Sequence, residues 1–163
     1  MNNVIKSQQD NLWITQTKNG PLLAHAFREG RVVLFFSVNR SKAFQGYAHM
    51  TSLPDSTIRP PPWITTTRAD MHTTPPFHVH WVTTAETPFH ELSHLKNDLN
   101  EHLPVSVGRD GQEFPEECAR RMMRIMDRPA AGTTGLGRSR WSRRGGSAGV
   151  EGENLLVDFE APT

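Results

Sequence analysis

The stretch RVVLFFSVNRSKAFQGYAHM, residues 31–50, decides the fold. Arg31–Val38 contains a short run of apolar residues, which is typical of a buried strand. Asn39–Lys42 is polar and turn-like, and Ala43–Met50 alternates as a half-buried strand does. The stretch therefore predicts two strands joined by a turn.

The flanking segments place more strands around this pair and a helix at the end. Before it, Val4–Ser7 is expected to form a short strand, and apolar residues at helical spacing over 22–27 predict a helix that Asn19 caps. After it, Leu53–Pro62 is a proline-rich loop. Three further elements are predicted: a strand over 77–81, a strand over Pro104–Val107 and a helix over Glu116–Met126. Strands followed by a closing helix indicate the α+β class.

Composition changes near Asp127, which suggests a domain over residues 1–127 and a tail over 128–163. The tail holds seven of the 12 glycines and five arginines, with few apolar residues before Leu155. Such a segment buries too little surface to offset its ordering entropy, so a disordered Gly/Arg-rich tail is expected. Its end, Glu151–Glu160, is acidic.

The charge and cysteine content exclude several classes of protein. The net charge is +1, so strong non-specific binding to nucleic acid is not expected and local charges must make any RNA contact. The single cysteine, Cys118, excludes an internal disulfide and a Cys-x-x-Cys metal site. The N-terminus has no apolar signal region and no run spans a bilayer, which predicts a soluble intracellular protein without membrane contact.

The motifs for catalysis and metal binding are weak. His90-Glu91-Leu92-Ser93-His94 matches H-E-x-x-H, but Pro88 precedes it closely and no third ligand follows at the required spacing. His78 and His80 share one strand face and are interpreted as solvated. The sequence contains no G-x-S-x-G, P-loop or dinucleotide-binding motif. We therefore expect no enzyme activity, metal or cofactor.

The tryptophans offer a binding function. Trp81 lies in a strand pattern and is expected in the core, whereas Trp13 and Trp63 follow polar or proline-rich stretches. These two either close the ends of a small core or form the plates of a slot that stacks an RNA base. Stacking contributes about 1–3 kcal/mol per base. Lys6, Arg31, Arg40 and Arg109 are candidates for contacts with phosphate.

Several segments in a fixed order resemble one family, the YTH domain, over roughly residues 4–126. The matching segments are Ile5–Ser7, Trp13–Thr15, Val33–Ser41 (VLFFSVNRS), Phe44–Ala48 (FQGYA), Pro88-Phe89 after Trp81, Asn100–His102, Pro104-Val105 and Gly108–Glu113 (GRDGQE). The resemblance implies an open six-stranded β-barrel-like sheet flanked by helices. It also implies a reader of N6-methyladenosine in single-stranded mRNA, which acts in mRNA regulation without catalysis.

The resemblance assigns the walls of an aromatic cage. Trp13 and Trp63 look like two walls that stack on the methylated base. Counting back from Trp81 puts Thr73 at the third wall, with Met71 as a nearby apolar substitute. The carbonyl of Ile14 looks like the acceptor for the remaining N–H of the methylamine.

The resemblance also assigns contacts to the base edge and the RNA backbone. The residues concerned are Lys6, Ser7, Gln8, Asn11, Ile14, Thr15, Arg109 and Asp110. Arg109 resembles the phosphate-binding arginine of the family, with Asp110 in the same turn. Nuclear members are the more similar ones around Lys6-Ser7 and Gly108–Gly111, so the nucleus is favoured over the cytoplasm, with mRNA-processing proteins as possible partners.

Departures from the family pattern leave a second function open. The segment between Ser7 and Trp13 is short, Ser106 replaces a second basic residue, and Asp98-Leu99 replaces a proline-tryptophan pair. The alternative is a YTH-like module without methyl selectivity that binds RNA or proteins in general.

Overall fold

A computed structural model describes residues 3–128 and 154–159. The helices are α1 (Asn3–Asp10), α2 (Gly20–Glu29), α3 (Pro62–Asp70) and α4 (Glu116–Met126), with 3₁₀ turns η1 (Thr17–Asn19) and η2 (Phe89–Leu92). The strands are β1 (Leu12–Trp13), β2 (Val32–Ser37), β3 (Ala43–Met50), β4 (Phe77–Thr83), β5 (Thr87–Pro88), β6 (Lys96–Asn97), β7 (Leu103–Pro104), β8 (Gln112–Phe114) and β9 (Asn154–Phe159).

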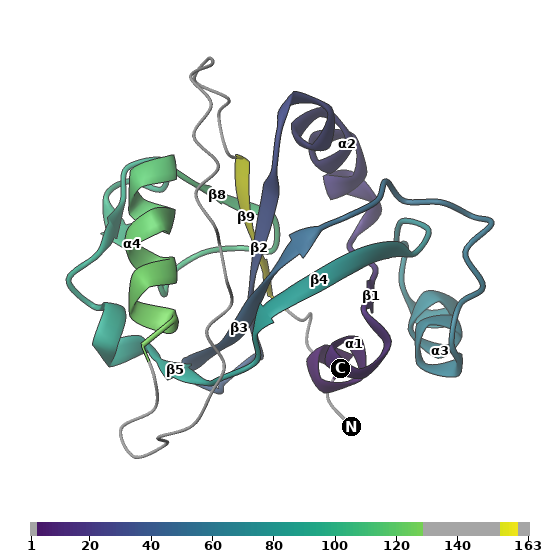
Figure 1. The fold of residues 1–163 in the computed structure, drawn as a ribbon, viewed down its shortest axis with the longest axis horizontal. Coiled ribbons are helices and arrows are strands. Elements are labelled where there is room, and N and C mark those ends of the chain that lie inside the picture. Colours follow the sequence, from purple (N-terminus) through teal and green to yellow (C-terminus); the bar gives the residue numbers. More distant parts are fainter. Residues whose placement is uncertain (1–2, 129–153, 160–163) are drawn as a thin grey trace, which may run out of the picture.

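The described strands form one large sheet and one small hairpin. The large sheet has seven strands in the order β1-β4-β3-β2-β9-β8, with β5 paired to β3, and β6 pairs with β7 separately. Figure 1 shows β2, β3 and β4 crossing the centre of the molecule. The expected α+β class and the hairpin of β2 and β3 are confirmed, although the sheet has seven strands where six were expected.

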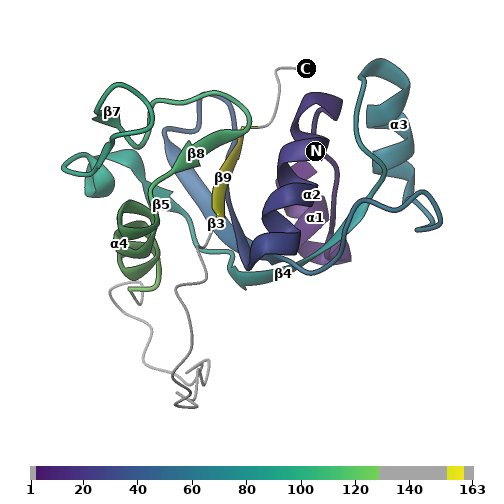
Figure 2. The ribbon, with the colours of Figure 1, turned by 90° about the horizontal axis from the view of Figure 1, so that it is seen from above.

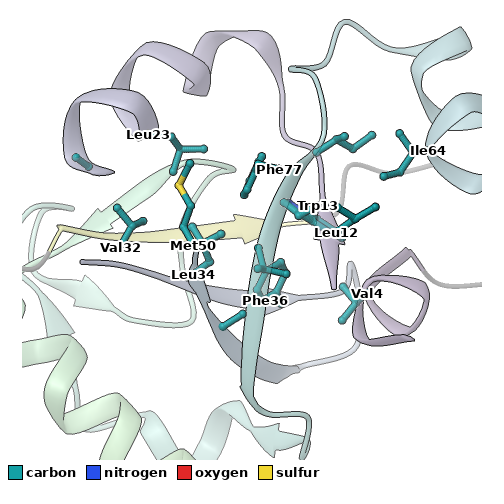
Figure 3. Packing of buried hydrophobic residues seen from close by; sticks show 14 of the residues in the cluster. Val4, Leu12, Trp13, Leu23, Val32, Leu34, Phe36, Met50, Ile64 and Phe77 are labelled. Atoms are coloured by element: carbon teal, nitrogen blue, oxygen red, sulfur yellow. The ribbon is translucent and has the colours of Figure 1, made fainter. Parts of the chain in front are cut away.

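Strand β2 lies between two hydrophobic cores, so all six of its residues are buried. Val32, Leu34 and Phe36 face the core that α1, α2 and α3 complete, shown in Figure 3. Val33 and Phe35 face the other core, which α4 and η2 complete. Figure 2 shows α4 and the α1–α2 pair on opposite sides of the sheet. The predicted buried strand is thus confirmed.

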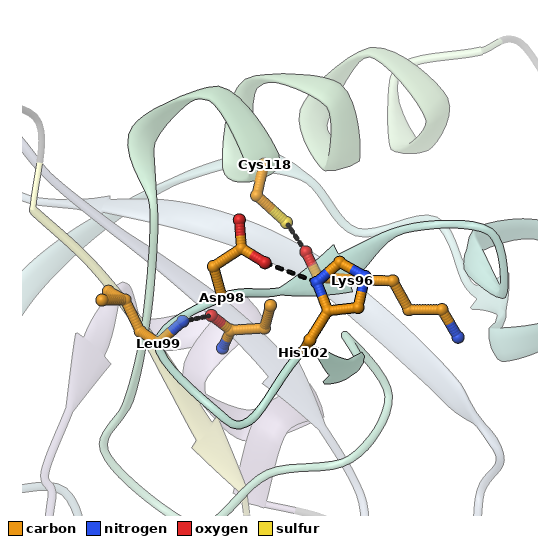
Figure 4. A network of polar contacts seen from close by, with 6 residues as sticks. Lys96, Asp98, Leu99, His102 and Cys118 are labelled. Atoms are coloured by element: carbon orange, nitrogen blue, oxygen red, sulfur yellow. Dashed lines mark hydrogen bonds and ion pairs between the residues drawn. The ribbon is translucent and has the colours of Figure 1, made fainter.

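A polar network ties α4 to the hairpin of β6 and β7 (Figure 4). The Cys118 thiol donates to the carbonyl of Lys96 over 3.3 Å, and burial raises the pKa of this thiol. The Asn97 side chain accepts the Leu99 N–H at 2.9 Å, and Asp98 contacts His102 beside it. These contacts fix the hairpin on the α4 side of the sheet.

Three predictions of secondary structure are corrected. Val4–Ser7 is part of helix α1, because Val4 and Ser7 are both buried at helical spacing while Ile5 between them is exposed. The proline-rich loop is confirmed up to Pro61, but Pro62 opens helix α3 at the first helical position and Trp63 lies in its first turn. Of Pro104–Val107 only Pro104 lies in a strand, and Val107 is exposed.

The predicted tail contains an ordered strand. Asn154–Phe159 forms β9, parallel to β2 along its whole length and antiparallel to β8, so the expectation of disorder is wrong for these six residues. The physical reason is that β2 needs hydrogen-bond partners on both edges when both of its faces are buried. Apart from Arg128, the rest of the predicted tail, with its other four arginines, lies outside the described residues. Within the described part no helix is long and apolar enough to cross a membrane.

Candidate RNA-binding site

The structure brings Trp13 and Trp63 into contact, although they are 50 positions apart in the sequence. Their ring centroids are 6.3 Å apart at an interplanar angle of 43°. Trp13 is held on β1, which pairs with β4, and its ring meets Phe36 edge-on at 5.0 Å. With 4% and 9% of their surfaces exposed, Trp13 and Trp63 are both buried in the first core.

The orientation of Trp63 depends on a residue that the sequence did not indicate. Its indole N–H donates to Asp10 Oδ2 at 2.8 Å, and Asp10 is the last residue of α1. A tryptophan N–H removed from water needs such an acceptor. Because α1 was predicted as a strand that ends at Ser7, nothing in the local pattern pointed to Asp10.

The two indoles do not form parallel plates in this structure. A base stacked between two rings needs about 7 Å between their planes, twice the optimal carbon–carbon separation of about 3.5 Å. At 6.3 Å and 43°, the rings instead contact each other. Insertion of a base therefore requires a movement of Trp63 on α3 or of Trp13 on β1.

The turn Gly108–Gly111 lies against the segment that follows Trp13. Asn19 Nδ2 donates to Thr15 Oγ1 at 2.9 Å and to Asp110 Oδ2 at 3.1 Å. Gly111 has a φ of +81°, and a Cβ there would lie 2.3 Å from Asn19 Oδ1. Asn19 was predicted as a helix cap, and it precedes α2, but its side chain makes these tertiary bonds and no cap bond. Arg109 is exposed in the same turn.

The residues predicted for the third wall lie after α3. Met71 is the C-cap of α3 and is partly buried. Thr73 pairs with Gln16 in an isolated bridge, and its Oγ1 is buried without a partner among the described residues. The assignment of either residue to the third wall stays a prediction.

The carbonyl of Ile14 directly precedes Thr15, whose backbone N–H and C=O both have hydrogen-bond partners on Thr74. The Thr15 N–H donates to Thr74 Oγ1 at 3.3 Å, and the Thr74 N–H donates to the Thr15 carbonyl at 2.8 Å. Among the described backbone hydrogen bonds outside strands, none uses the Ile14 carbonyl as its acceptor. Its predicted role as acceptor for a methylamine is compatible with this arrangement and stays a prediction.

The predicted contacts at the N-terminus are placed on α1. Ser7 is fully buried, and its Oγ accepts the Trp81 indole N–H at 3.3 Å, while Gln8 donates to the carbonyl of Gln45 at 3.0 Å. Both side chains are thus used inside the protein. Lys6 is partly exposed, and Asn11 is exposed with a positive φ of 55°.

The histidines do not gather around a metal site. His90 and His94 are exposed around the short turn η2, and the described residues contain no group of three or more histidine, cysteine or acidic side chains placed to hold a metal. His49 on β3 differs from these because burial lowers its pKa to about 4, helped by the positive charges of Arg31 and His80. It is therefore neutral at physiological pH.

Comparison with known protein families identifies the family of this chain. The profile of the YT521-B-like domain (YTH) family matches residues 1–127. The chain therefore belongs to the YTH family, whose domain is an RNA-binding module and not a known enzyme fold.

Particular relatives agree with the family. The chain is 37% identical over 109 residues to zinc finger CCCH domain-containing protein 45 of Oryza sativa subsp. japonica, which covers 66% of this chain and 16% of the relative. It is 35% identical over 125 residues to the 30-kDa cleavage and polyadenylation specificity factor 30 of Arabidopsis thaliana, with 74% and 19% covered. The chain thus spans less than a fifth of the length of these two relatives.

A solved structure shows the same fold. The Toxoplasma CPSF4 YTH domain in complex with a 7-mer m6A-modified RNA superposes with a TM-score of 0.71 at 32% identity, over 80% of this chain and 87% of that one. The apo form of that domain gives 0.70 at 33% identity, over 76% of this chain and 78% of that one. The implied YTH fold is confirmed.

Proposed function

We propose that this domain binds single-stranded RNA that carries N6-methyladenosine, with Trp13 and Trp63 as walls of the base pocket. The observation that carries the proposal is the contact of these two indoles, from β1 and α3, at one edge of the core. The family match and the RNA complex of the similar Toxoplasma domain support it. The bases must be unpaired, because a base within a helix exposes neither face.

Recognition of the methyl group combines several small terms. Stacking on the indoles contributes about 1–3 kcal/mol, and burial of one methyl group contributes about 0.8 kcal/mol. The carbonyl of Ile14 accepts the remaining N–H of the methylamine, and Arg109 binds a phosphate. The unpartnered Thr73 Oγ1 makes the third wall polar, which lowers the preference for methylated RNA.

Insertion of the base requires the two indoles to separate. Trp63 is the more mobile wall in this mechanism, because it lies in the first turn of α3 and contacts α1 through a single side-chain hydrogen bond to Asp10. Trp13 also packs edge-on against Phe36 in the core. We expect Trp13 to stay in place while Trp63 moves.

The names of the relatives support a proposal for the cellular role of this domain. One of them is a cleavage and polyadenylation specificity factor, which supports a role in mRNA processing with protein partners from that machinery. We extend the proposal to a nuclear location on this ground.

The decisive test is a pair of titrations with methylated and unmethylated RNA of one sequence. The methylated RNA is expected to bind more tightly, and Trp63→Ala should remove at least about tenfold of that affinity, about 1.4 kcal/mol. Phe89→Ala is the matched control, because it removes a ring that packs on Phe44 in the other core. Equal affinities in the wild type would favour the alternative, a general RNA-binding module without methyl selectivity.

A further inference from the structure

A pocket is lined by residues that lie next to Trp13 and Trp63 in the sequence. It has a volume of about 610 Å³ and lies between the end of α1, β1 and the start of α3. The residues that line it are Asp10, Leu12, Arg59, Pro60, Pro61, Pro62, Thr65 and Thr66. Two of them join it to the cage: Asp10 holds the Trp63 indole, and Leu12 directly precedes Trp13.

The pocket wall is poor in hydrogen-bond donors. Its prolines have no N–H. The hydroxyls of Thr65 and Thr66 donate inward to the carbonyls of Pro61 and Pro62, at 3.5 and 3.0 Å. The pocket therefore presents acceptors to a ligand, with Arg59 as its charged donor.

Asp10 is the strongest acceptor in this wall. Its Oδ2 accepts the Trp63 indole N–H, and no described residue donates to its Oδ1. Asp10 is exposed, so Oδ1 is open to a ligand. A carboxylate at this place repels a phosphate and attracts the amino group of a base.

The backbone between Arg59 and Trp63 is conformationally restricted. The three prolines that separate it from Trp63 restrict the backbone, and Pro61 has extended angles of φ −67° and ψ 163°. Arg59 is exposed and makes no ion pair with a described residue. A guanidinium is suited to a phosphate oxygen or to the face of a base.

We propose that this pocket binds the base of a nucleotide adjacent to the methylated adenosine, and that it selects cytosine over uracil through Asp10. This inference rests on the proposed function, which supplies the single-stranded RNA that enters the pocket. The N4 amino group of cytosine donates to Asp10 Oδ1, whereas uracil presents a carbonyl there, which the carboxylate repels. Arg59 contacts the RNA outside this edge and does not discriminate.

The experiment uses the full chain and methylated RNA oligonucleotides that differ only in cytidine or uridine at the position 5′ or 3′ of the modified adenosine. At one of the two positions, cytidine is expected to bind about tenfold more tightly. Asp10→Asn keeps an acceptor for Trp63 but replaces the second oxygen by a donor, so it should reverse the preference toward uridine. Arg59→Ala should weaken both RNAs equally and keep the preference.

Asp98→Asn is the matched control, because it removes the same charge from an exposed site on the α4 side of the sheet. It should leave the cytidine preference unchanged. Equal binding of cytidine and uridine RNAs at both positions, or a preference that Asp10→Asn does not alter, would overturn the proposal.

The same oligonucleotides without the methyl group separate the two proposals. A cytidine preference that persists without methyl selectivity refutes the proposed function but supports the pocket. Methyl selectivity without a cytidine preference refutes the pocket alone, and the absence of any RNA binding refutes both. Melting temperatures of all variants show whether a lost preference reflects a lost fold.

Discussion

Replacement of Trp13 by alanine should weaken RNA binding and also destabilise the fold. The structure buries 96% of Trp13 in the first core. A buried tryptophan removes about 150–250 Å² from water, worth at most about 4–6 kcal/mol at 25 cal/mol per Å². Comparable core deletions cost about 3–5 kcal/mol.

The assay is thermal unfolding beside RNA titration. For a domain of this size, each kcal/mol lowers the melting temperature by about 2–4 °C, so Trp13→Ala should lower it by about 6–20 °C. A loss of RNA affinity in this variant must therefore be measured at a temperature where it remains folded. Trp63→Phe complements it, since a smaller aromatic ring remains while the hydrogen bond to Asp10, worth about 1 kcal/mol, is lost with part of the indole surface.

A melting temperature of Trp13→Ala within about 3 °C of the wild type, at most half of the smallest expected shift, would contradict this prediction. That result would mean that Trp13 does not pack on Phe36 in solution and that the cage stands open. A normal affinity of the folded Trp13→Ala protein for methylated RNA would instead refute its role as a cage wall.

Four further predictions address other parts of the molecule. Gly111→Ala should cost about 2–3 kcal/mol in urea unfolding, because it combines a positive φ with a collision against Asn19, and an unchanged midpoint would contradict this. Arg109→Ala should weaken methylated and unmethylated RNA alike and reduce the salt slope by about 0.7; a selective loss for methylated RNA would place Arg109 in the cage instead. Stability should fall as pH drops from 6.5 toward 4, because the pKa of His49 is lowered in the fold and the unfolded chain therefore binds this proton at a higher pH. His49→Gln should flatten the dependence of stability on pH in this range. An identical dependence in the variant would exclude His49 as its source. Deletion of residues 154–163 should lower the melting temperature, since β2 and β8 lose their shared neighbour; an unchanged transition would show that β9 adds no stability.

The helices and strands that the sequence predicted correctly are those with a hydrophobic pattern over many consecutive residues. The bounds of β3 and α4 are those predicted, because a polar turn precedes the eight residues of β3 and the eleven residues of α4 have one apolar face. Val4–Ser7 is too short for that, and four residues fit a strand or a helical turn equally well. Helix α3 contains three consecutive threonines, which have low helix propensity, so it formed no recognisable pattern.

The candidate site was predictable only where aromatic residues stand out. Trp13 and Trp63 were singled out from their sequence context and the family resemblance, and the structure brings them together. Asp10 and Asn19 were missed as site residues because their partners, Trp63 and Asp110, are 53 and 91 positions away. Hydrogen bonds between residues so far apart leave no periodic signal in a single sequence.

The short segment before Trp13 is largely helical, and this helix determines which of its side chains reach the tryptophans. Ser7 and Asp10 are three residues apart on α1, so they lie on one face of the helix. They accept the indole N–H groups of Trp81 and Trp63, respectively. Helix α1 thus connects Trp81, which packs against the first core, to Trp63, the proposed cage wall. The segment between Ser7 and Trp13 is short, and this departure from the family pattern places Asp10 next to Trp63. Asp10 therefore binds the indole of Trp63, the proposed cage wall, and also lines the neighbouring pocket.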